Sequence, residues 1–558
     1  MRDTILRINS IANWKNLFIA FLAAALVACG GSGGSSSSTS NSPIYTIVFD
    51  AGSSGTRGSL FKVIPGNGGY PQVTLLDGQS YEDNGINDFL PNPGLGTIDL
   101  QAWNKATNTW VDVLPGGVRP QGCDRGTDVY DTSHGGSVLA SVEGLGADDV
   151  GPCVLQPILD SMAGAMSAAG ITPSQVKVEL FATAGMRTMS QFNGGSYLDS
   201  DIATFYQIMK QYVQSKGYAV GDFMTSNGNS QEGIWTWVNL NDLYYNAFGG
   251  NTTYYSGAPT TRGDFEVGGS SMQIAFPTSS IPVGENNNVY AVTINGRSYN
   301  VFSKTYLGLG GDDARKFVRS YNYNNTSSPS STYTGLDCFP TNASAAYTKE
   351  DSGVALFNAS FFPTVTTPSS SNSTGTIWTT VLSNTASPLV MSAPGNFNLS
   401  SCTTKYNDVT SSVMALPRNN YGTLGQSGLS ATYADFIEKV GTSTSPFVGL
   451  DGFYYTANSL GLAPSSQLKS NFTQAQFKDA LDRTCPDSQT GPTGYTIRPM
   501  SICANATYMN NFLWRNSNSG GLFNSSTNAT FEGVVPSKIG NSTILTWTRG
   551  YLLLKYAN

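Results

Sequence analysis

The clearest pattern in the chain is a pair of apolar runs joined by a short polar segment. Residues 44–49 are all β-branched or aromatic, and a second, largely apolar run covers residues 59–63. The segment Asp50–Arg57 between them contains two glycines and two serines. This pattern predicts a buried strand, a tight turn and a returning strand.

The same plan occurs again about two hundred residues later, at Asp264–Phe276, with an acid, a spacer, glycines, adjacent serines and a returning strand. Between the copies, residues 176–180 predict a strand, and residues 228–241 predict a loop that continues as a helix with Glu232 at its start. A single turn of this kind usually only closes a hairpin. The repeat instead favours two turns that grip one ligand from both sides of a cleft.

The composition of these segments suits phosphate chemistry. Gly52 and Gly55 lack a Cβ, so backbone N–H groups and neighbouring hydroxyls can converge on a phosphoryl oxygen. Asp50 stands beside that turn, where it could hold a hydrated divalent cation. Glu232 could deprotonate a water molecule, a role that is typically worth about 10²–10⁴-fold in rate. The alternative for Glu232 is a helix-capping residue.

Composition narrows the class of partner. The chain has 558 residues, which favours two domains, and only 12% of them are charged. The formal net charge is -7 and no run of Lys and Arg occurs, so we expect no nucleic-acid polymer as a partner. A small anionic substrate is still possible, because backbone amides and a bound cation can supply a local positive field.

The first residues have the features of an export signal. Three basic residues precede an apolar run at 17–28 that is too short for a comfortable membrane span. Leu26–Cys29, followed by glycine, resembles the lipobox of bacterial lipoproteins, in which the cysteine is acylated. We therefore expect a signal peptide at 1–28, lipidation of Cys29 and a flexible linker to residue 43, with an uncleaved anchor or a plain cleaved signal as alternatives.

Six cysteines remain after Cys29, an even number for an oxidising compartment. Three disulfides are the natural expectation, and sequential pairing is the simplest of fifteen connectivities. The predicted pairs are Cys123–Cys153, Cys338–Cys402 and Cys485–Cys503.

Four segments in this order resemble the apyrase conserved regions of the nucleoside triphosphate diphosphohydrolase family, the GDA1/CD39-type family. They are DAGSSGTR at 50–57, ATAGMR at 182–187, the segment 228–241 and the segment 264–276. Shorter similarities lie at Asn92–Leu95, Tyr306–Gly310 and Trp547–Gly550. The resemblance extends from about residue 44 to residue 554.

That resemblance implies an α/β fold with two ribonuclease-H-like, actin-related lobes and an active-site cleft between them. Lobe I would comprise residues 44–225 plus about 530–558, and lobe II residues 226–529. The implied reaction is hydrolysis of terminal phosphates of nucleoside tri- and diphosphates, with Ca²⁺ or Mg²⁺ and a water that Glu232 activates. We expect a monomer, tethered by its lipid to the periplasmic or cell-surface face of a bacterial membrane.

The resemblance also implies roles for individual residues. The catalytic residues would be Glu232, Ser271 and Gln273; the phosphate contacts Ser53, Ser54, Gly55, Thr56, Arg57, Thr183, Gly268, Gly269 and Ser270; the water-mediated metal contacts Asp50 and Glu266; and the base contacts Tyr454 and Tyr508.

Some features depart from the family pattern or remain open. Glu266 stands where the family usually has Asp, and because Ca²⁺ accepts more variable geometry than Mg²⁺, we hypothesise that Ca²⁺ is tolerated or preferred. The alternatives for function are an exopolyphosphatase-like phosphatase and a non-catalytic nucleotide-binding surface lipoprotein. Residues 65–101, 321–400 and 516–528 are rich in loop-forming residues and are predicted to be surface loops or insertions.

Overall fold

A computed structural model describes most of the chain beyond residue 41. The described residues are 42–53, 55–66, 70–81, 85–90, 101–104, 109–112, 130–131, 137–138, 147–189, 198–249, 260–315, 318, 337–339, 397–414, 438–485, 501–514, 522–523, 529–539 and 543–557. The predicted signal peptide, Cys29, the linker, Ser54, Asn92–Leu95 and Cys123 lie outside these residues.

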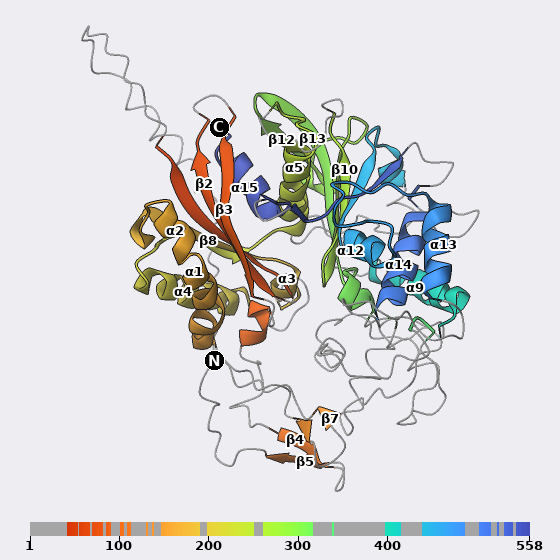
Figure 1. The fold of residues 1–558 in the computed structure, drawn as a ribbon, viewed down its shortest axis with the longest axis horizontal. Helices are drawn as coiled ribbons and strands as arrows, with labels where there is room; N and C mark the ends of the chain where they lie inside the picture. The colour runs from red at the N-terminus through yellow and green to blue at the C-terminus, as the bar shows by residue number, and fades with distance from the viewer. Residues whose placement is uncertain are drawn as a thin grey trace, which may run out of the picture. The chain divides into compact units, whose positions relative to one another are not determined.

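The first predicted hairpin lies at the centre of a five-stranded sheet with the order β3-β2-β1-β8-β9 (Figure 1). Its strands are β1 (Ile44–Ala51), β2 (Thr56–Ile64), β3 (Gln72–Tyr81), β8 (Val176–Ala182) and β9 (Ala219–Thr225). β1, β2 and β3 are antiparallel neighbours, whereas β8 runs parallel to both β1 and β9.

The second predicted hairpin lies at the centre of a six-stranded sheet, β12-β13-β11-β10-β14-β15. Its strands are β10 (Gly263–Val267), β11 (Ser271–Pro277), β12 (Val289–Ile294), β13 (Arg297–Leu307), β14 (Phe447–Asp451) and β15 (Phe531–Val534). Apart from β12, the sheet repeats the first one: an antiparallel hairpin, a third antiparallel strand on one side and two parallel strands on the other. The two similar sheets confirm the predicted α/β class with two lobes.

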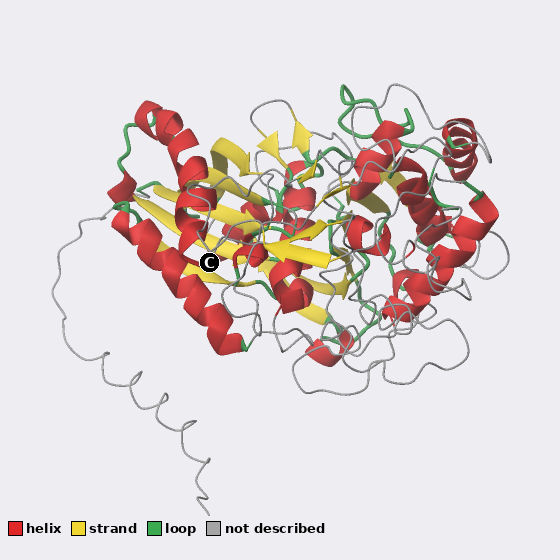
Figure 2. Ribbon diagram, turned by 90° about the horizontal axis from the view of Figure 1, so that it is seen from below, coloured by secondary structure: helices red, strands yellow, loops and turns green. Residues whose placement is uncertain are grey.

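Helices flank both sheets, as Figure 2 shows with helices in red and strands in yellow. Near the first sheet they are α1 (Gln156–Ser161), α2 (Ala163–Ala168), α3 (Ala184–Met189) and α4 (Asp199–Ser215); near the second, α9 (Leu399–Met414), α12 (Gly452–Ser459), α13 (Gln474–Thr484) and α14 (Ile502–Trp514). Small two-stranded ribbons are β4–β5 (Gln101–Asn104, Thr109–Asp112), β6–β7 (Tyr130–Asp131, Ser137–Val138) and β16–β17 (Lys538–Ile539, Thr543–Ile544). None of the described helices is long and apolar enough to cross a bilayer.

Two further helices, α5 (Gly233–Leu243) and α15 (Trp547–Lys555), pack against each other between the two sheets (Figure 1). Phe181 of β8, Trp235 of α5 and Trp547 of α15 have ring centroids 5.2 to 6.0 Å apart. The buried cluster around them includes Val48 from the first sheet and Ala275 from the second. One shared apolar core therefore holds both sheets and both helices together.

Two of the predicted disulfides, Cys338–Cys402 and Cys485–Cys503, are confirmed. Cys153 is also disulfide-bonded, but its predicted partner Cys123 lies outside the described residues.

The prediction that residues 65–101 form a surface loop is wrong for its middle part. Gln72–Tyr81 forms β3, which pairs with β2 at the edge of the first sheet. Most of its residues between 74 and 79 are partly exposed, as is common for an edge strand. With few buried positions and a glycine at 78, its sequence lacks the continuous apolar run that identified β1.

The crossing of α5 and α15 requires a glycine at residue 550. A Cβ there would lie only 1.8 Å from the backbone oxygen of Trp235. We expect Gly550→Ala to lower the free energy of unfolding by about 1–3 kcal/mol, because the two helices must move apart. Gly164→Ala in α2 is the control, since nothing lies within 4 Å of that Cβ and helix propensity should make it neutral or stabilising. Urea denaturation measures both variants, and equal stability of the two would contradict the tight crossing.

Glu532 of β15 forms ion pairs with Arg262, which directly precedes β10, at 3.1 Å, and with Lys469, at 3.1 Å. Burial alone would raise the pKa of Glu532, but hydrogen bonds from these two cations outweigh it and hold the pKa below its ordinary value. Because the pKa of Glu532 is lower in the folded state than its unfolded value of about 4.3, the charged side chain stabilises the fold at pH values above about 4.3. This contribution to stability is lost as the pH falls through the folded-state pKa.

We therefore expect Glu532→Gln to destabilise the protein by about 1–3 kcal/mol at pH 7 and by much less below about pH 4. Urea titrations across this pH range test the expectation. Asp482→Asn removes the exposed pair between Asp482 and Lys478 and should change little at any pH. A difference between wild type and Glu532→Gln that does not depend on pH would contradict this account.

Candidate functional site

The turns of the two central hairpins are closed by equivalent backbone hydrogen bonds. In the first, the amide of Gly52 donates to the carbonyl of Gly55 at 2.8 Å; in the second, the amide of Gly268 donates to the carbonyl of Ser271 at 3.0 Å. The flanking pairs are Ala51 with Thr56 and Val267 with Met272. Asp50 and Glu266 therefore occupy equivalent positions, one residue before the end of their strands.

The second turn is fixed by the segment that follows β13. Amides of Gly311, Asp312 and Gly308 donate in turn to the carbonyls of residues 268, 269 and 270. Because the C=O and N–H of one peptide plane point in opposite directions, the amides of residues 269 to 271 point away from that segment. Gly310 allows the close approach, since a Cβ there would lie 2.2 Å from the carbonyl oxygen of Gly269. The turn thus presents N–H groups in the way an anion-binding nest does.

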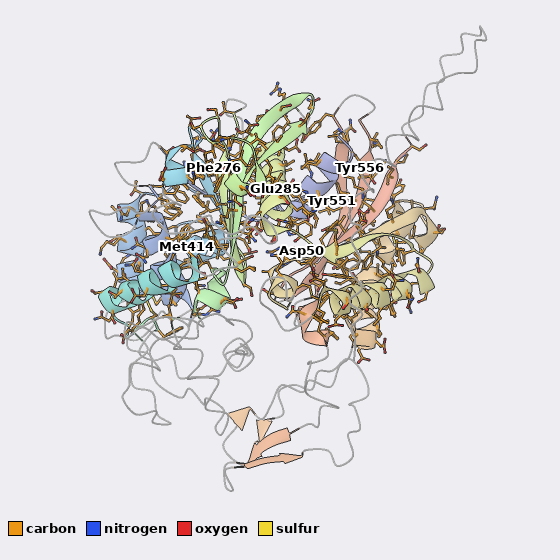
Figure 3. The ribbon with its side chains drawn as sticks, turned by 180° about the vertical axis from the view of Figure 1, so that it is seen from behind. Asp50, Phe276, Glu285, Met414, Tyr551 and Tyr556 are labelled. Atoms are coloured by element: carbon orange, nitrogen blue, oxygen red, sulfur yellow. A yellow bond between two sulfur atoms is a disulfide. The ribbon has the colours of Figure 1, made fainter. Side chains whose placement is uncertain are left out.

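Both turns line one cavity of about 530 Å³, called the site cavity below. Figure 3 labels Asp50, at the carboxyl end of β1. The predicted residues that line the cavity are Asp50, Ser53, Gly55, Arg57, Thr183, Glu232, Glu266, Gly268, Gly269, Ser270, Ser271 and Tyr508. The structure therefore brings together most of the residues that the sequence singled out.

Like charges crowd the site cavity. Burial raises the pKa of Asp50 to about 7; the charges of Glu232 and Asp451 add to the shift, while Arg57 and a hydrogen bond from Trp547 oppose it. Burial also raises the pKa of Glu266 well above its ordinary value, again with contributions from Glu232 and Asp451. These carboxylates are disfavoured in the charged form unless a cation is near.

Asp451 was not identified from the sequence. It ends β14, pairs with Val267 across the parallel strands and lines the site cavity. Its backbone has φ 49° and ψ -111°, a strained conformation for a residue other than glycine, and its side chain does not cap α12. Burial raises its pKa, Arg57 lowers it and Asp312 adds to the rise. The only signal in the sequence is its place three residues before Tyr454, a predicted base contact.

Glu232 is the last residue of a short π-helical turn, Gly228–Glu232. The turn leads directly into α5, so Glu232 lies at the start of the helix, as predicted. The turn begins at Asn227, whose side chain accepts from the amides of residues 229 and 230. The Glu232 side chain is 8% exposed, and its Oε2 accepts a hydrogen bond of 2.6 Å from Nη1 of Arg187. Arg187 lies in the ATAGMR motif at 182–187, but no role for it was predicted from the sequence.

Ser271 and Gln273 lie next to each other on β11. Nε2 of Gln273 donates to Oγ of Ser271 at 2.7 Å, and Nη2 of Arg187 donates to the same oxygen at 3.3 Å. Ser271 lines the site cavity, whereas Gln273 lies behind it. Gln273 therefore reaches the cavity through Ser271.

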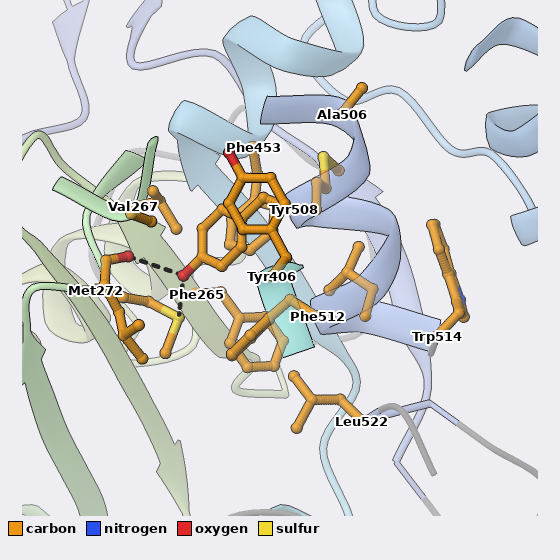
Figure 4. Packing of buried hydrophobic residues seen from close by; sticks show 14 of the residues in the cluster. Phe265, Val267, Met272, Tyr406, Phe453, Ala506, Tyr508, Phe512, Trp514 and Leu522 are labelled. Carbon is orange, nitrogen blue, oxygen red and sulfur yellow. Dashed lines mark hydrogen bonds between the residues drawn. The ribbon is translucent and has the colours of Figure 1, made fainter. Parts of the chain in front are cut away.

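Other residues predicted to belong to the site are buried, lie away from the cavity lining or fall outside the described residues. Thr56 is fully buried and does not line the cavity, and Ser54 is outside the described residues. Tyr508 is also buried, with its hydroxyl donating to the carbonyl of Leu309 at 2.8 Å and lying near Met272 (Figure 4). Tyr454 does not line the cavity, but its neighbour Tyr455 does and is 44% exposed.

The acids that line the site cavity suit a divalent cation whose coordination shell also contains waters and phosphate oxygens. Among the described residues, no three or more His, Cys, Asp or Glu side chains are grouped so that they could hold a metal ion. Asp50, Glu266 and Asp451 nevertheless surround the cavity with hard oxygen atoms. Such a set suits a hydrated divalent cation, with waters and phosphate oxygens completing its shell.

Comparisons with known proteins agree with this geometry. A guanosine-diphosphatase from Schizosaccharomyces pombe is 27% identical over 151 residues, which cover 26% of this chain and 24% of that protein. The chain thus matches about a quarter of the length of this relative. A solved nucleoside triphosphate hydrolase structure from Neospora caninum shares 14% identity with a TM-score of 0.50, covering 92% of each chain, so the likeness is one of fold.

The family model of the GDA1/CD39 (nucleoside phosphatase) family matches residues 154–446. This span includes three of the four motif segments: the ATAGMR segment with Arg187, the turn with Glu232 and the second hairpin. Because it also covers more than half of the chain, the protein belongs to the GDA1/CD39 (nucleoside phosphatase) family.

Proposed function

We propose that this protein hydrolyses the terminal phosphates of nucleoside tri- and diphosphates, as an apyrase-type enzyme, with a divalent cation and a water activated by Glu232. The observation that carries the proposal is the meeting of two hairpin turns, each closed by the same backbone hydrogen bond, and one buried glutamate at a single cavity. The amides would bind the phosphate chain from both lobes, and Glu232 would act on the attacking water.

The hydrogen bonds of Glu232 and Ser271 support a defined place for that water. Oε2 of Glu232 is bonded to Arg187, so Oε1 is the oxygen that would accept a proton from water. A serine oxygen accepts two hydrogen bonds and donates one. Since Oγ of Ser271 already accepts from Gln273 and Arg187, its O–H would donate to a lone pair of the water. The second lone pair of the water is then available to attack phosphorus.

Charge supports a substrate that arrives with a cation. Five acids line the site cavity, namely Asp50, Glu232, Glu266, Asp312 and Asp451, against one basic residue, Arg57. A bare polyphosphate would be repelled by this excess of negative charge. Asp50, Glu266 and Asp451 would hold a divalent cation, which when bound supplies charge neutralisation to the phosphoryl group.

Part of the cavity lining favours a nucleoside over plain polyphosphate. Tyr455, Tyr508, Ile502 and Met509 contribute aromatic and apolar surface to it. A nucleobase gains from stacking on such surface, whereas inorganic polyphosphate has no group that would. Stacking tolerates different bases, so we propose a loose base preference.

The central test is Glu232→Gln, assayed by release of phosphate from ATP, ADP, GDP, UDP and inorganic polyphosphate. We expect wild type to cleave the nucleotides, and the variant to lose about 10²–10⁴-fold in kcat, because only the group that accepts the proton is removed. Nucleotide binding, measured by calorimetry, should persist.

Glu285→Gln is the matched control, since Glu285 is exposed and outside the site cavity (Figure 3). It should keep wild-type turnover. Near-normal turnover of Glu232→Gln would mean that another group is the base. Release of phosphate from polyphosphate alone would favour the exopolyphosphatase reading, and binding without any release the non-catalytic one.

A second test concerns the longer arm of Glu266. Glu266→Asp shortens the side chain by one C–C bond, about 1.5 Å. If the longer arm suits the flexible coordination of Ca²⁺, the variant should raise the ratio of the rate with Mg²⁺ to the rate with Ca²⁺. EDTA should abolish turnover in both proteins, and either ion should restore it. A wild-type rate far higher with Mg²⁺ than with Ca²⁺ would refute the predicted tolerance of Ca²⁺.

A further inference from the structure

We propose that Arg187 is a positioning residue that sets which atoms of Glu232 and Ser271 face the attacking water. The inference rests on the proposed function, because it concerns the same site. The observation behind it is that one guanidinium donates to both side chains, at 2.6 Å and 3.3 Å, although Arg187 does not itself line the site cavity.

Arg187 is held rigidly in the first lobe. It lies on α3, directly after β8, and α3 packs closely on the first turn: a Cβ on Gly185 would lie 2.8 Å from Cα of Ser53. Nη1 of Arg187 also donates to the Ser226 carbonyl, at 3.3 Å, and to the Ser226 hydroxyl oxygen, at 3.1 Å. The Ser226 hydroxyl in turn donates to the carbonyl of Ala182. The guanidinium is thus anchored before it meets Glu232.

The bond to Glu232 selects one carboxylate oxygen. Oε2 is engaged by Arg187, and both side chains are at least 92% buried, with 7% of Arg187 and 8% of Glu232 exposed. A charge-assisted hydrogen bond in a buried setting fixes the rotation of a carboxylate. Oε1 is then the oxygen left to receive the proton.

The bond to Ser271 acts in the same way on the second lobe. Ser271 lies on β11, and its Oγ accepts from Arg187 and Gln273 together. With both acceptor positions used, the hydroxyl proton has to point elsewhere, which orients it as a donor to the water. One planar group thus aligns a base that precedes α5 and a donor on β11, and the planar fork of arginine is suited to two bonds at once.

In the reaction, the water oxygen forms a bond to the terminal phosphorus as the bond from that phosphorus to the bridging oxygen breaks. The bridging oxygen leaves with the electron pair on the shortened nucleotide, and the proton of the water moves to Oε1 of Glu232. Arg187 exchanges no atom in this step. It holds Oε1 and the Ser271 proton where the step needs them, and an error of about 1 Å in such a placement can cost about 100-fold in rate.

The test compares Arg187→Ala and Arg187→Lys with wild type in kcat, KM and pH profile. We expect Arg187→Ala to lower kcat by about 100-fold with little change in KM, because the substrate does not touch Arg187. The acid limb of the kcat/KM profile should move up by about one pH unit or more, since the base loses its cationic partner. Arg187→Lys keeps the charge but not the two-point geometry, so its acid limb should stay in place while kcat still falls. Added guanidinium should partly restore Arg187→Ala.

A double variant separates this inference from the proposed function. Because Arg187 acts partly through Glu232 and partly through Ser271, Arg187→Ala should lower kcat by much less in a Glu232→Gln background than in wild type, and that background also leaves no unpaired carboxylate. Arg262→Lys is the matched control, a weakened buried ion pair away from the site cavity, and it should lower Tm without moving the acid limb. Two results would overturn the role of Arg187 and leave the proposed function intact. One is a full additional loss of kcat in the double variant. The other is a raised KM with an unmoved acid limb in Arg187→Ala. Near-normal turnover of Glu232→Gln would overturn the proposed function with it.

Discussion

The site depends on the close crossing of α5 and α15 between the two sheets. A glycine at residue 550 lets the backbones meet next to Trp235, and both helices begin at the site cavity. Glu232 directly precedes α5, and Trp547, the first residue of α15, bonds to Asp50. One packing contact therefore sets the separation between Glu232, the proposed base, and Asp50, a proposed metal contact. The positive ends of both helix dipoles also face the place where phosphate would bind.

The acids of the site cavity destabilise the fold. Several carboxylates share a buried space in which each raises the pKa of its neighbours, and Asp451 adds a strained backbone. An apolar core of the same shape would be more stable. Under the proposed function, a cation and its phosphate ligand would relieve this repulsion, so the repulsion would contribute to binding the cation. The rigid sheets and the shared aromatic core on either side keep the acids from moving apart.

The sequence predicted what is local and what is repeated. Both hairpins could be found because their apolar strands and glycine turns are contiguous, and the second copy showed that the first was more than a loop closure. β3 was missed because an edge strand needs fewer buried positions. Asp451 and the partners of Arg187 could not be found from spacing, since a parallel strand pairing and contacts over 45 and 84 residues bring them to the site. Tyr454 and Tyr455 could not be told apart from the sequence. Adjacent residues on a helix point about 100° apart, so which of the two faces the cavity depends on how α12 is oriented.

The position of α15 in the chain has a consequence for biosynthesis. The helix that completes the shared core begins at Trp547, about 500 residues after β1, with which it packs. At roughly 5–20 residues per second, a ribosome needs about 25–100 s to deliver it after β1 has emerged. During that interval Phe181 and Trp235 lack their aromatic partners on α15 and present an apolar surface. The nascent chain therefore presents apolar surface that chaperones can bind, and the shared core can be complete only after α15 has been made.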